Sequence, residues 1–180
     1  MRLSFLAVLV VGLAVVPGAD AYVIGGRPWP DDSITYNAGT GPGARDVDRA
    51  ARVWNRARVG VRLRREPGSY ADVVFRSGGP HCGGAAPIGY QRWWRVTVLL
   101  GHGCNRRLVT LNAVHELGHV LGLDHERRRC ALMNPSSDQT GTPSRCRRRA
   151  LRWWLRHPLR GDDVRGARTL YSGGAWHRAP

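Results

Sequence analysis

The sequence of 180 residues contains no lysine, so arginine supplies all 28 of its basic side chains, against 13 acidic ones. The formal net charge is therefore +15. We interpret this charge mainly as a solvated basic surface; the alternative is an attraction to anionic cell walls, membranes or acidic protein substrates. No nucleic-acid-binding motif accompanies the arginines, so the charge does not predict a nucleic-acid partner.

The sequence also lacks an apolar run long enough for a permanent membrane span, which needs about 20 residues. The longest run, Leu3 to Val16, follows a positively charged start and ends at Pro17-Gly18. The small residues of Ala19-Asp20-Ala21 then resemble a signal-peptidase site. We therefore expect residues 1–21 to be a cleaved secretory signal and the mature chain, from about Tyr22, to be extracellular. An uncleaved membrane anchor is the alternative.

Cys-x-x-Cys pairs are absent, which argues against a zinc site built from thiolates. The four cysteines are an even number, as expected for a chain exported to an oxidising compartment. Four cysteines allow three pairings. We favour disulfides between sequence neighbours, Cys82 with Cys104 and Cys130 with Cys146, because each would close a single loop.

Internal repeats are absent as well, and residues 22–180 suffice for one domain with a hydrophobic core. β-prone runs and helical apolar spacings predict the order strand, helix, strands, helix, loop, helix. That order indicates an α+β domain rather than alternating βαβ units. The expected strands are 33–37, 61–64, 71–75 and 95–100, the expected helices are 44–58, 109–122 and 162–171, and 173–180 is expected to be a flexible tail.

The most informative segment runs from His115 to His125 and reads HELGHVLGLDH. On a helix, His115 and His119 lie one turn apart on the same face, so both imidazoles can aim at one zinc ion. Glu116, rotated by about 100° around the helix axis, can reach a ligand of the metal without binding the metal itself. Gly122 should end the helix in a left-handed conformation and let the chain return His125 as a third ligand.

Three protein ligands leave an open position for water, which distinguishes a catalytic zinc site from a structural one. Zinc lowers the pKa of its bound water to about 7, and Glu116 would act as the general base during attack on a peptide carbonyl. A surface pair would explain His115 and His119 alone, but not Gly122 and His125 at their offsets. The remaining histidines carry no such spacing and are expected on the surface or in loops: His81, His102, His157 and His177.

This segment resembles the signature of the metzincin zinc proteases, His-Glu-x-x-His-x-x-Gly-x-x-His, at every fixed position. Met133 is similar to the methionine of their Met-turn, and the short interval from His125 to Met133 resembles the matrixin branch. The resemblance implies a zincin-like α+β fold, with a twisted, mainly parallel five-stranded sheet, an active-site helix and a Met-turn that supports the site without binding the metal. It also implies that residues 83–87 belong to the edge strand along which matrixin substrates bind.

By the same resemblance, we expect a secreted, zinc-dependent endopeptidase that hydrolyses extracellular polypeptides with one catalytic Zn2+. We expect a monomer. The alternative is a cationic wall- or membrane-binding protein on the same scaffold, with weak or no proteolysis; the intact Glu116 and metal ligands argue against it. Structural calcium is not indicated, because no acidic cluster forms a recognisable loop. Asp162-Asp163 is explained as the favourable negative start of a helix.

Three features depart from the matrixin pattern. Glu126 follows the third histidine, as in the related astacin branch, and we expect it to be an exposed carboxylate beside three arginines. Ser136-Ser137 replaces the usual Pro-x-Tyr in a segment that walls the specificity pocket of matrixins, so substrate preference is not carried over. Every cysteine follows the first expected strand, so we expect no upstream cysteine that blocks the metal.

Residues 144–158 form a basic insert without an obvious matrixin counterpart. Its mixture of arginine, tryptophan and leucine suits a membrane-surface helix. We favour the alternative, in which an apolar stripe packs on the domain and Cys146 fastens the segment. That stripe comprises Ala150, Leu151, Trp154 and Leu155. We likewise expect Trp93-Trp94 to lie in the core or to line a pocket.

Overall fold

A computed structural model describes residues 20–41, 43–79 and 81–172. The expected signal segment up to residue 19 and the expected tail, 173–180, lie outside the described residues. The strands are β1 (Val23–Ile24), β2 (Ser33–Asn37), β3 (Arg62–Arg65), β4 (Val73–Ser77), β5 (Gly84–Ala85), β6 (Val96–Leu100) and β7 (Leu123–Asp124). The helices are α1 (Ala44–Ala57), α2 (Arg106–Val120), α3 (Leu151–Arg156) and α4 (Gly161–Tyr171).

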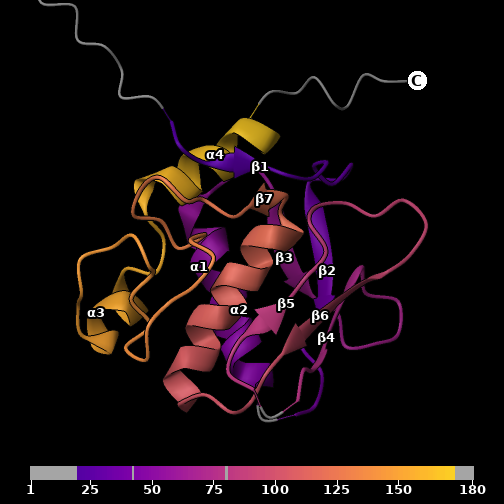
Figure 1. Ribbon diagram of the computed structural model, residues 1–180. Helices are drawn as coiled ribbons and strands as arrows, with labels where there is room; N and C mark the ends of the chain where they lie inside the picture. The colour runs from indigo at the N-terminus through magenta and orange to yellow at the C-terminus, as the bar shows by residue number, and fades with distance from the viewer. Residues whose placement is uncertain (1–19, 42, 80, 173–180) are drawn as a thin grey trace, which may run out of the picture.

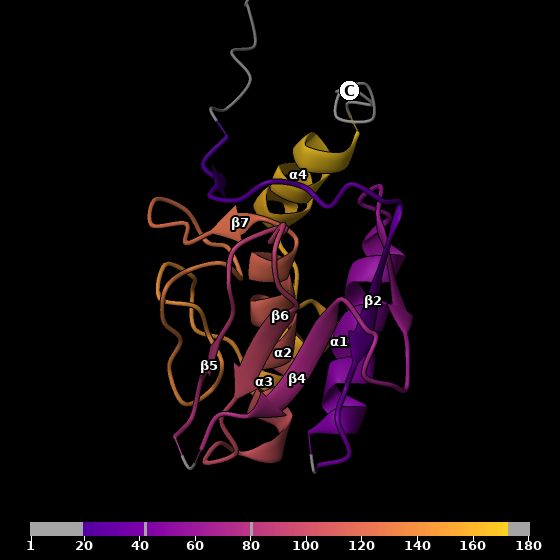
Figure 2. The same cartoon turned by 90° about the vertical axis from the view of Figure 1, so that its right-hand side faces the viewer.

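The main sheet has the strand order β3-β2-β4-β6-β5. Four strands run parallel, whereas β5 pairs antiparallel with β6 at one edge. α1 and α2 pack against each other and cover one face of the sheet, as Figures 1 and 2 show. The α+β class and the mainly parallel, five-stranded sheet expected from the sequence are therefore confirmed.

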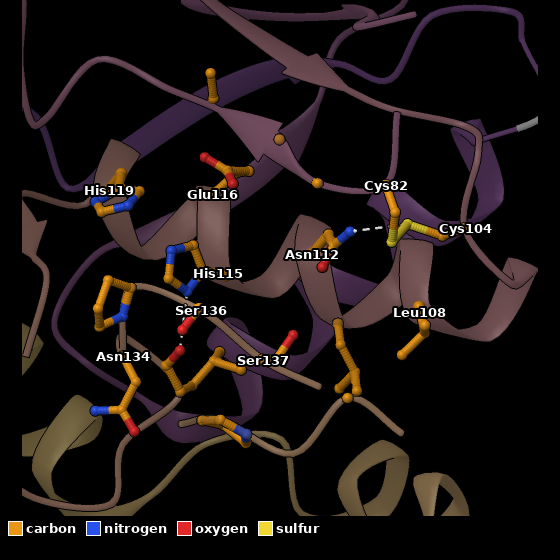
Figure 3. A pocket seen from close by; sticks show the side chains of 18 of the residues that line it. Cys82, Cys104, Leu108, Asn112, His115, Glu116, His119, Asn134, Ser136 and Ser137 are labelled. Atoms are coloured by element: carbon orange, nitrogen blue, oxygen red, sulfur yellow. Dashed lines mark hydrogen bonds between the residues drawn. A yellow bond between two sulfur atoms is a disulfide. The ribbon is translucent and has the colours of Figure 1, made fainter. Parts of the chain in front are cut away.

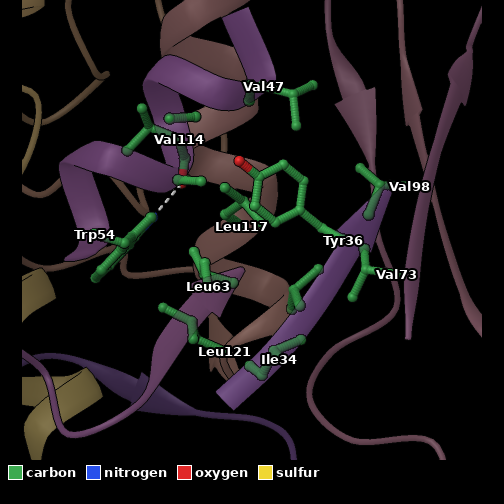
Figure 4. Close-up of a cluster of buried hydrophobic side chains, with 14 of the residues drawn as sticks. Ile34, Tyr36, Val47, Trp54, Leu63, Val73, Val98, Val114, Leu117 and Leu121 are labelled. Atoms are coloured by element: carbon green, nitrogen blue, oxygen red, sulfur yellow. Dashed lines mark hydrogen bonds between the residues drawn. The ribbon is translucent and has the colours of Figure 1, made fainter. Parts of the chain in front are cut away.

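The main core lies between the sheet and the two long helices (Figure 4). In α1, the three- and four-residue spacing of Val47, Ala50, Ala51, Trp54 and Ala57 predicts one buried face; the first four are buried there, whereas Ala57 is only partly buried. The indole Nε1 of Trp54 donates a 2.9 Å hydrogen bond to the backbone carbonyl of Val114 in α2. A buried donor thus finds its partner, and the bond fixes α1 against the helix that carries the two predicted metal ligands.

The basic insert packs on the domain, as favoured from the sequence. Trp154 of α3 is buried against Leu108 and Leu111 of α2, and its Nε1 donates a 3.0 Å hydrogen bond to Oγ1 of Thr142. The apolar residues Leu151 and Leu155 are partly buried around it, whereas Ala150 is exposed. A disulfide joins Cys130 to Cys146 beside this cluster, and a second one joins Cys82 to Cys104.

The expectation for Trp93-Trp94 is wrong. The side chains are 76% and 67% exposed, because the pair sits in a turn just before β6 rather than within the strand. The antiparallel pair of β1 with β7 was not predicted either; it holds the segment after residue 20 against the chain that follows α2. Within the described ranges, none of the helices has the length and apolar character needed to cross a membrane.

Candidate metal centre

Helix α2 positions two of the three predicted histidines. It starts after Asn105, whose side chain caps it by accepting a 3.0 Å hydrogen bond from the backbone N–H of Arg107. It starts three residues earlier than predicted and ends at Val120. His115 and His119 lie one turn apart and both face the same cleft, as Figure 3 shows.

The chain after α2 turns back and supplies the third histidine. Gly122 has a φ of +105°, the conformation predicted for the end of the helix. After β7, the Nε2 atom of His125 lies 3.3 Å from Nε2 of His115 and 3.2 Å from Nε2 of His119. The structure thus brings the three histidines together in one cluster.

Backbone carbonyls fix the tautomers of the two helical imidazoles. Nδ1 of His115 lies 2.9 Å from the carbonyl oxygen of Leu132, and Nδ1 of His119 lies 2.8 Å from that of Leu123. A carbonyl can only accept, so each neutral ring carries its proton on Nδ1 and presents an unprotonated Nε2. Two lone pairs therefore point at the Nε2 of His125, which can donate a proton to only one of them.

A bound cation would resolve this crowding, and the two separations that involve His125 match those of a zinc site. Zn–N bonds of about 2.0–2.1 Å in a tetrahedral arrangement separate the ligand nitrogens by about 3.3 Å. The two separations from Nε2 of His125 are 3.2 and 3.3 Å. Hydrogen bonds from Nδ1 to carbonyls are also how metal-binding histidines are usually oriented. The donor set of His115, His119 and His125 therefore fits a zinc ion.

The electrostatics of the cluster favour neutral imidazoles. Burial, followed by the charge of His119, lowers the pKa of His115 to about 4. Burial also lowers the pKa of His119 and that of His125 from their ordinary value. All three rings are therefore unprotonated at neutral pH, the state in which an imidazole can bind a metal.

Glu116 lies beside the three histidines without joining their cluster. Its side chain faces the same cleft (Figure 3) but is buried, and this burial raises the pKa of the carboxyl to about 7. Gly84 of the edge strand lies against it: a Cβ atom at position 84 would approach Oε1 of Glu116 to 2.7 Å. The carboxyl group is therefore confined between α2 and β5.

A family model for matrixin matches residues 71–172, which include this whole constellation. The chain belongs to the matrixin family.

Three metalloproteinase relatives illustrate the similarity. Human matrix metalloproteinase-15 is 28% identical over 187 residues, covering 83% of this chain and 26% of the relative. Rabbit (Oryctolagus cuniculus) macrophage metalloelastase is 33% identical over 100 residues, covering 56% and 18%. Matrix metalloproteinase-B of Caenorhabditis elegans is 46% identical over 43 residues, covering 23% and 8%. The chain thus spans about a quarter or less of the length of these relatives.

The turn around Met133, which the resemblance to matrixins leads us to expect as the Met-turn, lies directly beneath α2. Met133 is buried, and its sulfur lies so close to Gly118 that a Cβ atom at position 118 would approach it to 2.4 Å. Asp163 of α4 stabilises this turn by accepting hydrogen bonds from the backbone N–H groups of Leu132 (2.9 Å) and Met133 (3.1 Å). Burial raises the pKa of Asp163 to about 6, although the hydrogen bonds from these N–H groups by themselves lower it.

The sequence analysis missed this role of Asp163, which it explained only as the negative start of a helix. The residue does cap α4, since its Oδ2 accepts a 2.7 Å hydrogen bond from the backbone N–H of Arg160. Its contact with the Met-turn spans about thirty residues of sequence, so no local pattern indicates it.

The expectation for Glu126 is wrong. Its side chain is only 1% exposed. Oε1 accepts hydrogen bonds from the backbone N–H groups of Arg128 and Arg129, the latter at 2.7 Å, and both arginines are exposed without an ion pair to Glu126. Asn134 completes the loop by donating to the carbonyls of Glu126 (2.8 Å) and Arg129 (2.9 Å). The carboxylate therefore organises the backbone that follows the third histidine, instead of neutralising the arginine side chains.

A cleft of about 1060 Å³ runs along α2 past the histidines. One wall is the segment 82–86, which includes β5; the other is the segment 134–139, which includes Ser136-Ser137 (Figure 3). The disulfide between Cys82 and Cys104 closes the first wall against the start of α2. The other histidines lie away from this cleft: His81, His102 and His157 are exposed, and His177 lies outside the described residues.

Proposed function

We propose that this matrixin is a zinc-dependent endopeptidase whose metal is held by His115, His119 and His125. The observation that carries the proposal is the convergence of three Nε2 atoms, two of them in rings whose Nδ1 faces a backbone carbonyl. This arrangement presents three neutral donors to one point and leaves the side towards the cleft open. An open position distinguishes a catalytic zinc site from a closed structural one.

Glu116 is the proposed general base. Bound zinc would supply an acidified water and a Lewis acid that polarises the substrate carbonyl. The carboxylate of Glu116 would accept the proton of the attacking water and later deliver it to the leaving amine. Its confinement between α2 and Gly84 keeps it beside the histidines, which suits a group that must be within reach of the water throughout the reaction.

The edge strand β5 is the proposed docking site of the substrate backbone. β5 pairs with β6 on one side, and its residues are exposed and line the cleft. An extended polypeptide can add to such an edge through main-chain hydrogen bonds, which would place a peptide carbonyl across the cleft from Glu116. Ser136 and Ser137 on the opposite wall would contact the substrate side chains.

We further propose that the chain is secreted after removal of residues 1–21. The two disulfides support an oxidising destination, because such bonds persist outside the cytosol. A cationic binding protein without proteolysis remains the competing function, supported by the net charge of +15. The complete set of metal donors and the buried carboxyl beside them favour the enzyme.

Substitution of Glu116 distinguishes these two functions. In Glu116→Gln, we expect the hydrolysis of casein or gelatin to fall by about 10²-fold or more, because general-base catalysis contributes about 10²–10⁴-fold. Zinc content, measured on the same samples, should stay near one ion per chain because the three imidazoles are intact. Glu66→Gln, which changes an exposed glutamate of the same sequence, is the matched control and should retain full activity.

Equal activity of Glu116→Gln and the unaltered protein would exclude the proposed mechanism. A purified protein without zinc and without hydrolysis would favour the binding function instead.

A further inference from the structure

Three large aromatic side chains are exposed at one end of the sheet: Tyr70 (90%), Trp93 (76%) and Trp94 (67%). We call these three residues the aromatic face. Tyr70 and Trp93 each lie three residues before a strand of the parallel pair β4 and β6, whose first residues, Val73 and Val96, are partners in the register. The two loops therefore leave the same end of adjacent strands, and Figure 1 shows both projecting from the sheet on the right-hand side.

The surroundings of the aromatic face are cationic. Arg92 and Arg95 flank the tryptophans; both are exposed, and neither forms an ion pair with a described residue. The guanidinium of Arg92 lies 4.7 Å from the ring centre of Trp93, so charge and aromatic surface are presented together. The loop between β5 and β6 contains no acidic residue.

The acidic residues of the neighbouring loop do not neutralise these arginines. The carboxylate of Asp72 is already hydrogen-bonded to Thr35: the backbone N–H and the hydroxyl of Thr35 donate to Oδ2 of Asp72 at 2.7 and 2.6 Å. Glu66 is exposed and lies at the far end of the β3–β4 loop. Asp31 and Asp32 precede β2, which lies on the side of β4 away from β6. The part of this surface nearest the tryptophans is therefore positively charged.

We propose that the aromatic face docks the protein on lipid bilayers that contain anionic lipids. Tryptophan and tyrosine rings favour the headgroup region of a bilayer, and each nearby arginine adds attraction to an anionic leaflet. A sugar-binding platform would also expose aromatic rings, but it needs free amide or carboxylate partners. The only amide of this turn, that of Gln91, donates to the backbone carbonyls of Ile88 and Gly89.

The basic insert, which the sequence suggested as the alternative membrane helix, is less suited to this role. Its Trp154 is buried, and its Trp153 is partly buried beneath the guanidinium groups of Arg149 and Arg160, at 5.6 and 5.3 Å. The loop that carries Trp93 and Trp94, in contrast, starts beside β5, and its first residue, Ala86, lines the cleft. Docking through this loop would hold the cleft close to the bilayer surface. The inference does not depend on the metal or on catalysis.

Vesicle binding tests this proposal. The purified chain is sedimented with vesicles of phosphatidylcholine alone and of equal parts phosphatidylcholine and phosphatidylglycerol, at low and high salt. We expect binding to the anionic vesicles only, weakened by salt. W93A/W94A should weaken it at least about tenfold. R92Q/R95Q should weaken it about thirtyfold, from about one kcal/mol per arginine. Brominated lipids should quench the tryptophan fluorescence of the unaltered protein, a measurement that needs no variant.

The matched control is R147Q/R148Q, which removes two exposed charges from the basic insert. It should bind within about twofold of the unaltered protein, because the docking surface is intact. All proteins share one N-terminus, verified by mass spectrometry, so any binding by the apolar N-terminal segment is common to them. Thermal melts establish that each variant is folded.

Three results would overturn the proposal. The first is unaltered binding of W93A/W94A. The second is an equal loss in R147Q/R148Q and R92Q/R95Q, which would indicate a diffuse attraction of the whole charged surface. The third is no binding to anionic vesicles, including the case in which the tryptophans are instead required for retention on an insoluble neutral polysaccharide.

Discussion

Replacing Gly118 with alanine tests how closely α2 rests on the methionine beneath it. A Cβ atom at this position would lie 2.4 Å from the sulfur of Met133, 3.1 Å from its terminal methyl carbon and 3.3 Å from Cζ2 of Trp54. Non-bonded heavy atoms are most stable about 3.5–4.0 Å apart. The sulfur would therefore have to move by more than about 1 Å within a close-packed core.

Two opposing contributions determine how much Gly118→Ala changes the free energy of unfolding. Overpacking a core costs about 1–3 kcal/mol, whereas alanine is better than glycine in a helix interior by about 1 kcal/mol. Gly118→Ala alone should therefore lower the free energy of unfolding by about 0–2 kcal/mol. Met133→Ala should lower it by about 2–5 kcal/mol through the cavity that it leaves. In the double variant the clash is absent, so its loss should be smaller than the sum by about 1–3 kcal/mol.

Urea denaturation of the two single variants and the double variant measures this coupling. Gly161→Ala is the control, because a Cβ atom there would meet only the guanidinium end of Arg165, at 3.1 Å; it should be nearly neutral and should add independently to Met133→Ala. Gly118→Ala should also weaken zinc binding by about tenfold, because the displaced Met-turn carries the carbonyl that orients His115. Additive effects of Gly118→Ala and Met133→Ala, within about 0.5 kcal/mol, would refute the packing argument.

Three further predictions address the site and its frame. Gly84→Ala should reduce kcat about 10- to 100-fold at unchanged zinc content, because a Cβ atom at position 84 would lie 2.7 Å from Oε1 of Glu116; full activity would contradict the proposed positioning. The pKa of His115 falls from 6.5 to about 4 on folding, so only the unfolded chain binds this proton between those values. In chelator-treated protein, the contribution of His115 to the unfolding free energy, measured in urea as the difference between the unaltered protein and His115→Gln, should therefore drop by about 1.4 kcal/mol per pH unit from pH 6.5 towards 4. Glu116 and Asp163, whose pKa values are raised to about 7 and about 6, act in the opposite direction in both proteins. Replacing Cys130 and Cys146 with serine should cost about 3 kcal/mol, because their disulfide closes a separation of 16 residues; an unchanged urea midpoint would contradict this.

The parts of the site that the sequence predicted are those fixed by local geometry. His115 and His119 meet because a helix repeats every 3.6 residues, and any four-residue spacing on a helix gives the same result. Gly122 is equally local, since its φ of +105° suits a residue without a Cβ atom. The fold class followed in the same way, from the order of short periodic segments along the chain.

The parts that the sequence did not predict depend on contacts between distant segments. Asp163 and Glu126 are carboxylates that composition places at the surface, yet both are buried with backbone N–H donors around them. The sequence also did not show which of the two tryptophan pairs is buried. Trp153-Trp154 and Trp93-Trp94 both stand among arginines in the sequence, but Trp154 is buried and Trp93 is exposed. Which pair faces solvent is decided by whether an apolar surface of another element lies opposite.

The buried carboxylates explain how a loop without regular structure can hold a metal ligand in place. Between His125 and Asn134 the backbone forms no helix or strand, so its buried N–H groups lack the partners that secondary structure provides. Glu126 and Asp163 supply those partners, and Asn134 supplies the donors for the carbonyls. Asp163 ties this loop to α4, and the carbonyl of Leu132 ties it to His115 of α2. The loop ordered in this way places Nε2 of His125 at 3.3 and 3.2 Å from the Nε2 atoms of His115 and His119.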